Sequence, residues 1–242
     1  MKTISAPLAI HQSLQESIKG KYSLVEDSLE SAEIIIYKDS LNQILIDSHQ
    51  NQNIMDIVSF KNFEKDKNLE APSLDHYKEI FSLNFKEESV TEVRNRINKY
   101  LGDQNFDGYF SEIERYLKTI STELIQNAII IGKESLTAKK VEYKLMENAK
   151  SWLIQVIDLH GSLTKKHVLE KLARACEEKT FEEKETGAGL GFYMLLNACD
   201  KLIFEIDKEK KTKVSVIINK YKRLKDYKSK NISIHFLNND GE

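Results

Sequence analysis

The chain has few of the residues that cross-link a protein or interrupt regular structure. Its 242 residues include two cysteines, two prolines and one tryptophan. Cys176 and Cys199 lie far apart and form no CxxC pair, which argues against a disulfide framework and against a cysteine zinc site. The sequence therefore predicts a reduced protein whose fold depends on a hydrophobic core.

Long hydrophobic runs are also missing. No apolar run approaches the length of about 20 residues that a membrane-spanning helix needs. The first segment, MKTISAPLAIHQSLQES, has a single lysine and a short apolar run that Pro7 interrupts, which is too weak for a secretory signal. We therefore expect a cytoplasmic protein that does not enter a membrane.

The sequence has no large excess of charge of either sign. Lysine and arginine number 36, aspartate and glutamate 38, and the net charge is −2. This balance argues against a protein that binds nucleic acid through bulk charge, although it permits a small anionic ligand held locally. With 40% apolar residues, the chain is long enough for one large domain or two small ones.

The first quarter of the chain has a strand-like pattern. Short β-branched runs separated by polar turns predict strands at YSLVED (22–27), AEIIIYKD (32–39), NQILIDS (42–48) and NIMDIVSF (53–60). Residues 61–75 are charged and contain Pro72, which is typical of a boundary. We therefore divide the chain into a strand-rich sensing or docking region (1–75), a second domain (76–222) and a tail (223–242) with one further strand, NISIHFL.

The second domain alternates helices with strands. Helices are predicted over 88–101, 108–131, 164–179 (capped by Ser162 or Thr164) and 190–200. A hairpin is predicted from KVEYKLM and SWLIQVID, and two more strands from KLIFEID and TKVSVII. Helices combined with a mostly antiparallel sheet indicate an α+β fold in two layers.

Two polar residues interrupt the apolar face of the long helix. The face itself consists of Leu117, Ile120, Leu124, Ala128 and Ile131. Asn127 falls inside this stripe and Glu123 near its edge, and their spacing of four residues points them the same way. Burying either group without a partner costs about 1–3 kcal/mol. We therefore expect a ligand or another residue to satisfy them.

Glycines are concentrated before the helix at 190–200. The segment TGAGLGFYML places Gly187, Gly189 and Gly191 at alternate positions, where free N–H groups and the helix dipole suit a phosphate, although a plain flexible loop has the same composition. No GK[ST] follows and no strand leads directly in, which argues against a Walker A loop and a dinucleotide fingerprint. Asp158 ends the strand WLIQVID. It is either a solvated end or, if buried, an acceptor for a group such as a purine amine.

In their order and spacing, ELIQNAI, VIDLHG, GAGLGFYML and TKVSVII resemble the ATP-binding domain of the GHKL superfamily over about residues 88–220. The resemblance is closest to the branch of histidine kinases and anti-sigma-factor serine kinases. It implies a two-layer α/β sandwich of the Bergerat type that binds Mg²⁺ and ATP. It also implies roles for single residues: Glu123 as general base, Asn127 as the Mg²⁺ ligand, Asp158 and Thr212 at the adenine, Gly161 beside the base, and Gly187, Gly189 and Gly191 in the lid hinge.

Three positions depart from the pattern of that branch. Ile131 stands where a basic residue that faces phosphate is common, Gly161 lies one residue late in DLHG, and Lys211 replaces the glycine before Thr212. Six basic residues after Gly161 could supply a phosphate contact, and the sequence does not choose among them: Lys165, Lys166, Lys171, Arg174, Lys179 and Lys184. Trp152, Phe192 and Tyr193 are predicted to be core residues.

Two functions are compatible with these motifs. The first is anti-sigma-like phosphorylation of a serine or threonine on a regulatory protein partner. The second is a nucleotide-gated binding switch or scaffold without phosphoryl transfer. His11, His49 and His76 have no acidic residue directly after them, so none fits the phosphoacceptor of a complete sensor kinase. The partner and a homodimeric state are left open.

Overall fold

The computed structural model describes residues 2–7, 14, 22–26, 29, 32–38, 41–66, 72–85, 90–103, 110–133, 141–159, 163–177, 190–207, 211–221 and 223–238. The strands are β1 Lys2–Ala6, β2 Tyr22–Glu26, β3 Ile34–Tyr37, β4 Asp56–Ser59, β5 Lys78–Phe85, β6 Val141–Glu147, β7 Ser151–Asp158, β8 Lys201–Asp207, β9 Lys211–Asn219 and β10 Ser233–Asn238. The helices are α2 Leu41–Ser48, α3 Phe60–Asp66, α4 Val90–Gly102, α5 Phe110–Lys133, α6 Lys165–Glu177, α7 Leu190–Ala198 and α8 Leu224–Lys228.

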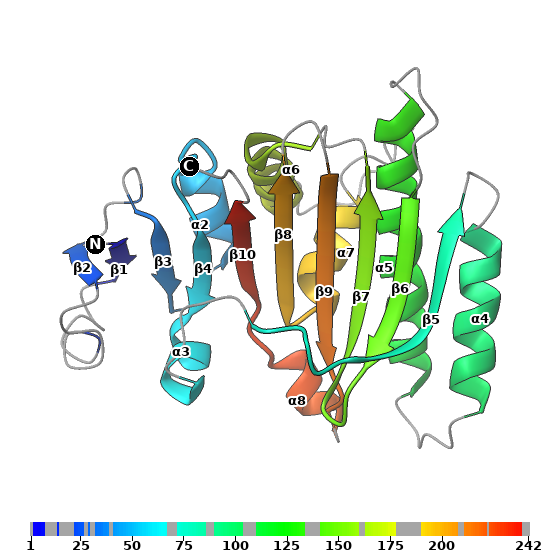
Figure 1. Cartoon of the computed structure of the whole chain (residues 1–242). Coiled ribbons are helices and arrows are strands. Elements are labelled where there is room, and N and C mark those ends of the chain that lie inside the picture. The colour runs from blue at the N-terminus through cyan, green and yellow to red at the C-terminus, as the bar shows by residue number, and fades with distance from the viewer. Residues whose placement is uncertain are drawn as a thin grey trace.

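The described strands form one ten-stranded sheet in the order β2-β1-β3-β4-β10-β8-β9-β7-β6-β5 (Figure 1). Strands β1 to β4 pair in parallel. From β8 to β5 every pairing is antiparallel. Strand β10 joins the two halves, antiparallel to β4 and parallel to β8. The chain therefore has a mixed helix-and-sheet fold, which agrees with the coarse α+β prediction.

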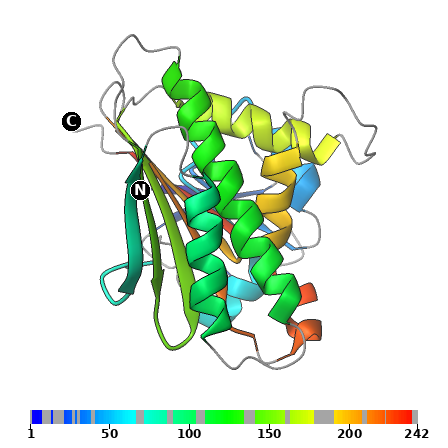
Figure 2. The same ribbon diagram turned by 90° about the vertical axis from the view of Figure 1, so that its right-hand side faces the viewer.

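Helices α5, α6 and α7 cover one face of the sheet, and α4 packs against α5 (Figure 2). Of the stripe predicted on α5, Leu117, Ile120, Leu124 and Ala128 are buried. They share a core cluster with Trp152 and Ile154 of β7. Burying each such side chain contributes about 1.5–3 kcal/mol. Thr164 caps α6, because its Oγ1 accepts a hydrogen bond of 3.2 Å from the backbone N–H of His167.

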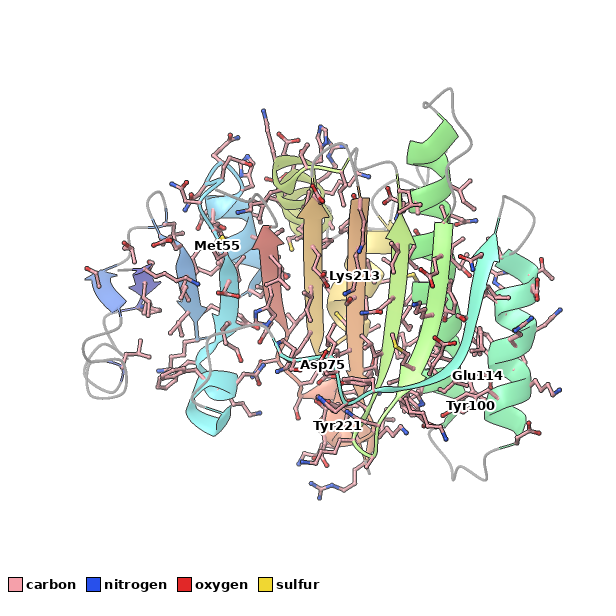
Figure 3. All side chains as sticks on the ribbon, in the orientation of Figure 1. Met55, Asp75, Tyr100, Glu114, Lys213 and Tyr221 are labelled. Atoms are coloured by element: carbon pink, nitrogen blue, oxygen red, sulfur yellow. The ribbon has the colours of Figure 1, made fainter. Side chains whose placement is uncertain are left out.

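The opposite face is partly covered and partly polar. Leu153, Ile203 and Ile217 form a small cluster beneath the segment that leads into β5. Farther along the same strands, Lys213 pairs with Glu205 at 2.6 Å in the open part of the sheet (Figure 3). One face of the sheet is dry and the other is partly solvated. This difference explains why apolar and polar residues alternate along parts of β8 and β9.

One predicted strand is wrong. Residues 42–48 lie in helix α2, where Leu41, Ile44, Leu45 and Ser48 recur at the spacing of a helical face. Leu45 and Ser48 are buried. The run is so short that its isoleucines and leucines fit the two-residue period of a strand as well as the 3.6-residue period of a helix. The helix packs against α6, and this contact favours the helical form. The other three predicted strands of this region are confirmed as β2, β3 and β4.

The tail strand β10 lies inside the sheet, between β4 and β8. Buried His235 donates a hydrogen bond of 2.7 Å from Nδ1 to Oδ1 of Asp56. Beside it, the Tyr37 hydroxyl donates to the carbonyl of Ile232 at 2.7 Å. The three predicted regions of the chain therefore share one sheet.

The contact between His235 and Asp56 yields a test of this junction. His235→Ala leaves the buried Asp56 carboxyl without its donor, which should lower the free energy of unfolding by about 1–3 kcal/mol in urea titrations. His76→Ala, at an exposed position, is the matched control and should change it by less than about 0.5 kcal/mol. Equal effects of the two substitutions would contradict the role of this pair.

Candidate functional site

A pocket lies between the helix layer of α5, α6 and α7 and the strands β7, β8 and β9. Its empty volume is about 480 Å³, a figure that includes space open to solvent. Most of its lining is apolar. The lining residues are Leu124, Asn127, Ala128, Val156, Asp158, Leu163, Lys171, Phe192, Leu195, Phe204, Thr212 and Val214.

Asp158 and Thr212 reach this pocket from neighbouring strands. Their Cα atoms are direct partners in the antiparallel pairing of β7 with β9. Side chains alternate along a strand, so Val156 and Asp158 of β7 point to the same face, and both line the pocket. Asp158 is 6% exposed and Thr212 is fully buried. The alternative of a solvated Asp158 at the strand end is therefore excluded, and the buried alternative holds.

Thr212 carries an unsatisfied polar atom into the pocket. Its buried Oγ1 has no hydrogen-bond partner in the described part of the chain. An unpaired buried hydroxyl costs about 1–3 kcal/mol. A ligand with a polar group at this point would remove that cost.

Asn127 approaches from helix α5, between the pocket-lining residues Leu124 and Ala128. It is half-buried. No group of three histidine, cysteine, aspartate or glutamate residues able to hold a metal occurs among the described residues. Asn127 offers the pocket an amide oxygen, a group that can bind Mg²⁺ together with phosphate oxygens and water.

Glu123 lies one helical turn before Asn127 and is also half-buried. Burial raises the pKa of its carboxyl above the usual glutamate value. A raised pKa makes the carboxylate a better proton acceptor near neutral pH. Glu123 does not line the pocket in the described structure, so the structure brings together Asn127, Asp158 and Thr212 but leaves Glu123 beside them.

Lys171 is the basic residue that sequence reasoning could not select. It lines the pocket from α6, with Nζ 5.6 Å from the ring centroid of Phe192 on α7. Lys165 instead donates to the carbonyl of Gln52, and Lys166 pairs with Glu170 on the same helix. Lys171 follows buried Val168 by three residues on α6, but Lys165 precedes Val168 by the same spacing, so the helical pattern alone does not identify Lys171.

The structure describes some of the remaining predicted site residues. Gly191 is the second residue of α7, as expected for the start of the apolar helix. Gly161, Gly187 and Gly189 lie outside the described residues, as do Lys179 and Lys184. The core prediction is confirmed for Trp152 and Phe192, and Phe192 also forms a pocket wall.

No protein-family model matches the chain, and no curated protein sequence matches it.

Within the described residues, none of the helices has both the length and the apolar character needed to cross a membrane.

Burial of Glu123 yields a prediction for stability against pH. Because its pKa is raised in the folded state, folding disfavours the ionised carboxylate above the usual glutamate pKa of 4.5. Glu123→Gln should therefore raise the urea midpoint at pH 7, and this gain should shrink as the pH falls toward 4.5. The same substitution at exposed Glu79 is the control. A gain at Glu123 that is equal at both pH values would contradict the effect of burial.

Proposed function

We propose that the pocket binds Mg²⁺ and ATP and that this domain belongs with the two-layer Bergerat-type sandwiches of the GHKL superfamily. One observation carries the proposal. Three residues that the order of motifs along the chain singles out line one pocket, although they come from three different elements. These residues are Asn127, Asp158 and Thr212. Residues chosen at random from α5, β7 and β9 would be divided between the two faces of these elements.

The chemistry of the lining suits a nucleotide base. Asp158 is an acceptor for an exocyclic amine, and the Thr212 hydroxyl is a second polar contact beside it in the same strand register. Val156, Val214 and Phe204 are apolar walls for a planar ring. The proposed adenine end is therefore the sheet layer of the pocket.

The chemistry of the helix layer suits phosphate. Asn127 offers an amide oxygen to Mg²⁺, which neutralises charge on the phosphates when it is bound. The start of α7, with Gly191 as its second residue, adds backbone N–H groups that favour an anion. This arrangement positions the triphosphate rather than forming a covalent bond to it.

In the proposed reaction, a serine or threonine hydroxyl of a regulatory partner attacks the terminal phosphoryl group. Glu123 accepts the hydroxyl proton, the new O–P bond forms, and ADP leaves. The raised pKa of Glu123 strengthens it as a base. The protein would then act in the cytoplasm as an anti-sigma-like serine/threonine kinase.

A second function is favoured by the position of Glu123 outside the pocket lining. In that case ATP binding alone would shift the protein between states that differ in affinity for a partner, without phosphoryl transfer. Ile131, at a position where a basic residue is common in the branch that the sequence resembles, agrees with this alternative.

The binding proposal predicts a specific pattern in calorimetric titrations. Wild-type protein should bind ATP with Mg²⁺, Asp158→Asn should weaken binding by at least about tenfold through loss of a charge-assisted hydrogen bond, and Asn127→Ala should remove the dependence on Mg²⁺. Exposed Asp103→Asn and Gln126→Ala are the matched controls. Failure of the wild type to bind at millimolar ATP would overturn the proposal.

The two functions are separated by transfer of the γ-phosphate from radiolabelled ATP. A kinase should label a partner protein or release phosphate, and Glu123→Ala should lower this rate by about 10²–10⁴-fold, the usual contribution of a general base. ATP affinity should stay within about threefold. Binding without any turnover in the wild type would instead support the nucleotide-gated switch.

A further inference from the structure

The pocket lining contains two charged side chains among the described residues, Asp158 in the sheet layer and Lys171 in the helix layer. Asp158 is almost fully buried, and Lys171 is half-buried. The two charges approach from the two layers that enclose the pocket. A ligand that matched both would carry a hydrogen-bond donor toward the sheet and negative charge toward α6.

The ammonium group of Lys171 has no anionic partner in the described structure. Its Nζ atom lies over the face of the Phe192 ring, 5.6 Å from the ring centroid. Two other lysines of α6 have polar partners. Lys166 forms an ion pair with Glu170, and Lys165 donates a hydrogen bond to a backbone carbonyl. Within the described part of the chain, Lys171 is therefore a positive charge held over the aromatic ring of Phe192 without a counterion.

The position of Lys171 on α6 explains why it reaches the pocket. It follows Val168 by three residues and precedes Ala175 by four, and both of these are buried. Residues at these spacings share one helical face. The aliphatic stem of the lysine can cover apolar surface while its ammonium group stays at the edge of the pocket.

We infer that Lys171 binds the phosphate chain of the nucleotide and makes the pocket selective for nucleotides over nucleosides. The inference rests on the proposed function, and it assigns a phosphate contact that the motifs along the chain do not identify. Lys171 reaches the site from α6, whereas the branch resembled here often places a basic residue four positions after Asn127, where this chain has Ile131.

The contact between Lys171 and Phe192 also suggests what happens when a ligand arrives. A cation held over an aromatic ring in a partly exposed site is bound weakly, whereas a charge-assisted hydrogen bond to phosphate is stronger. The ammonium group therefore moves from the ring to the phosphate when a nucleotide enters. A lysine suits this transfer because its charge is compact and its stem is flexible.

The test compares ligands that differ only in phosphate. Calorimetric titrations of the full chain with adenosine, ADP and ATP, each with Mg²⁺, are made for wild type, Lys171→Ala and Lys171→Arg. Lys171→Ala should weaken ADP and ATP by about ten- to a hundredfold and leave adenosine unchanged. Lys171→Arg should keep most of the affinity for both nucleotides. Lys166→Ala, on the exposed side of α6, should leave all three affinities unchanged.

The possible results separate this inference from the proposed function. Nucleotide binding by Lys171→Ala at wild-type affinity would overturn the inference and leave the ATP site intact. An equal loss for adenosine and ATP would also overturn it, because the lysine would then act on the fold of the pocket. If wild type binds adenosine but neither nucleotide, both proposals fail, and the same is true if it binds none of the three ligands.

Discussion

The site depends above all on the register between β7 and β9. In that register Asp158 faces Thr212 directly, and Val156 faces Val214. A slip of one residue in either strand would turn its polar group to the opposite face of the sheet, because side chains alternate along a strand. Strand β6 fixes β7 from the other side, and α5 closes the pocket from above the sheet. The pocket is therefore a consequence of strand pairing rather than of a loop.

The strands that hold this register are themselves held by the junction at β10. Strand β8 pairs with β9 on one edge and with β10 on the other, so β10 connects the pocket strands to the parallel strands near the N-terminus. The hydrogen bond of His235 to Asp56 joins residues 179 positions apart. Such a junction gives the N-terminal strands a physical connection to the site, through the sheet and through the packing of α2 against α6.

Sequence patterns were sufficient where an element was long and consistently periodic. Helix α5 and strand β7 follow their predicted bounds closely, because their apolar faces repeat over many residues. The short run at α2 was ambiguous, and its packing decided the outcome. The order of strands could not be predicted, because pairing between β4 and β10 joins distant segments. Asn127, Asp158 and Thr212 could be named from their motifs. Lys171 could be chosen among the basic residues only from the structure, because the choice depends on which side chain reaches the pocket.

Three features of the site each make the folded state less stable than it need be. Among the described residues, the Thr212 hydroxyl has no hydrogen-bond partner and Lys171 lies over an aromatic ring without a counterion. Burial also raises the pKa of Glu123. Elsewhere in the described core, Ser121, Tyr143 and Gln155 have hydrogen-bond partners, whereas Glu112 Oε2 and His235 Nε2 have none among the described residues. Thr212 and Lys171 line the pocket and Glu123 lies beside it, so a ligand that supplied partners there would remove part of this cost. Under the proposed function, an anionic ligand with a polar ring would give the Thr212 hydroxyl a hydrogen-bond partner and the Lys171 ammonium group a counterion at the same time.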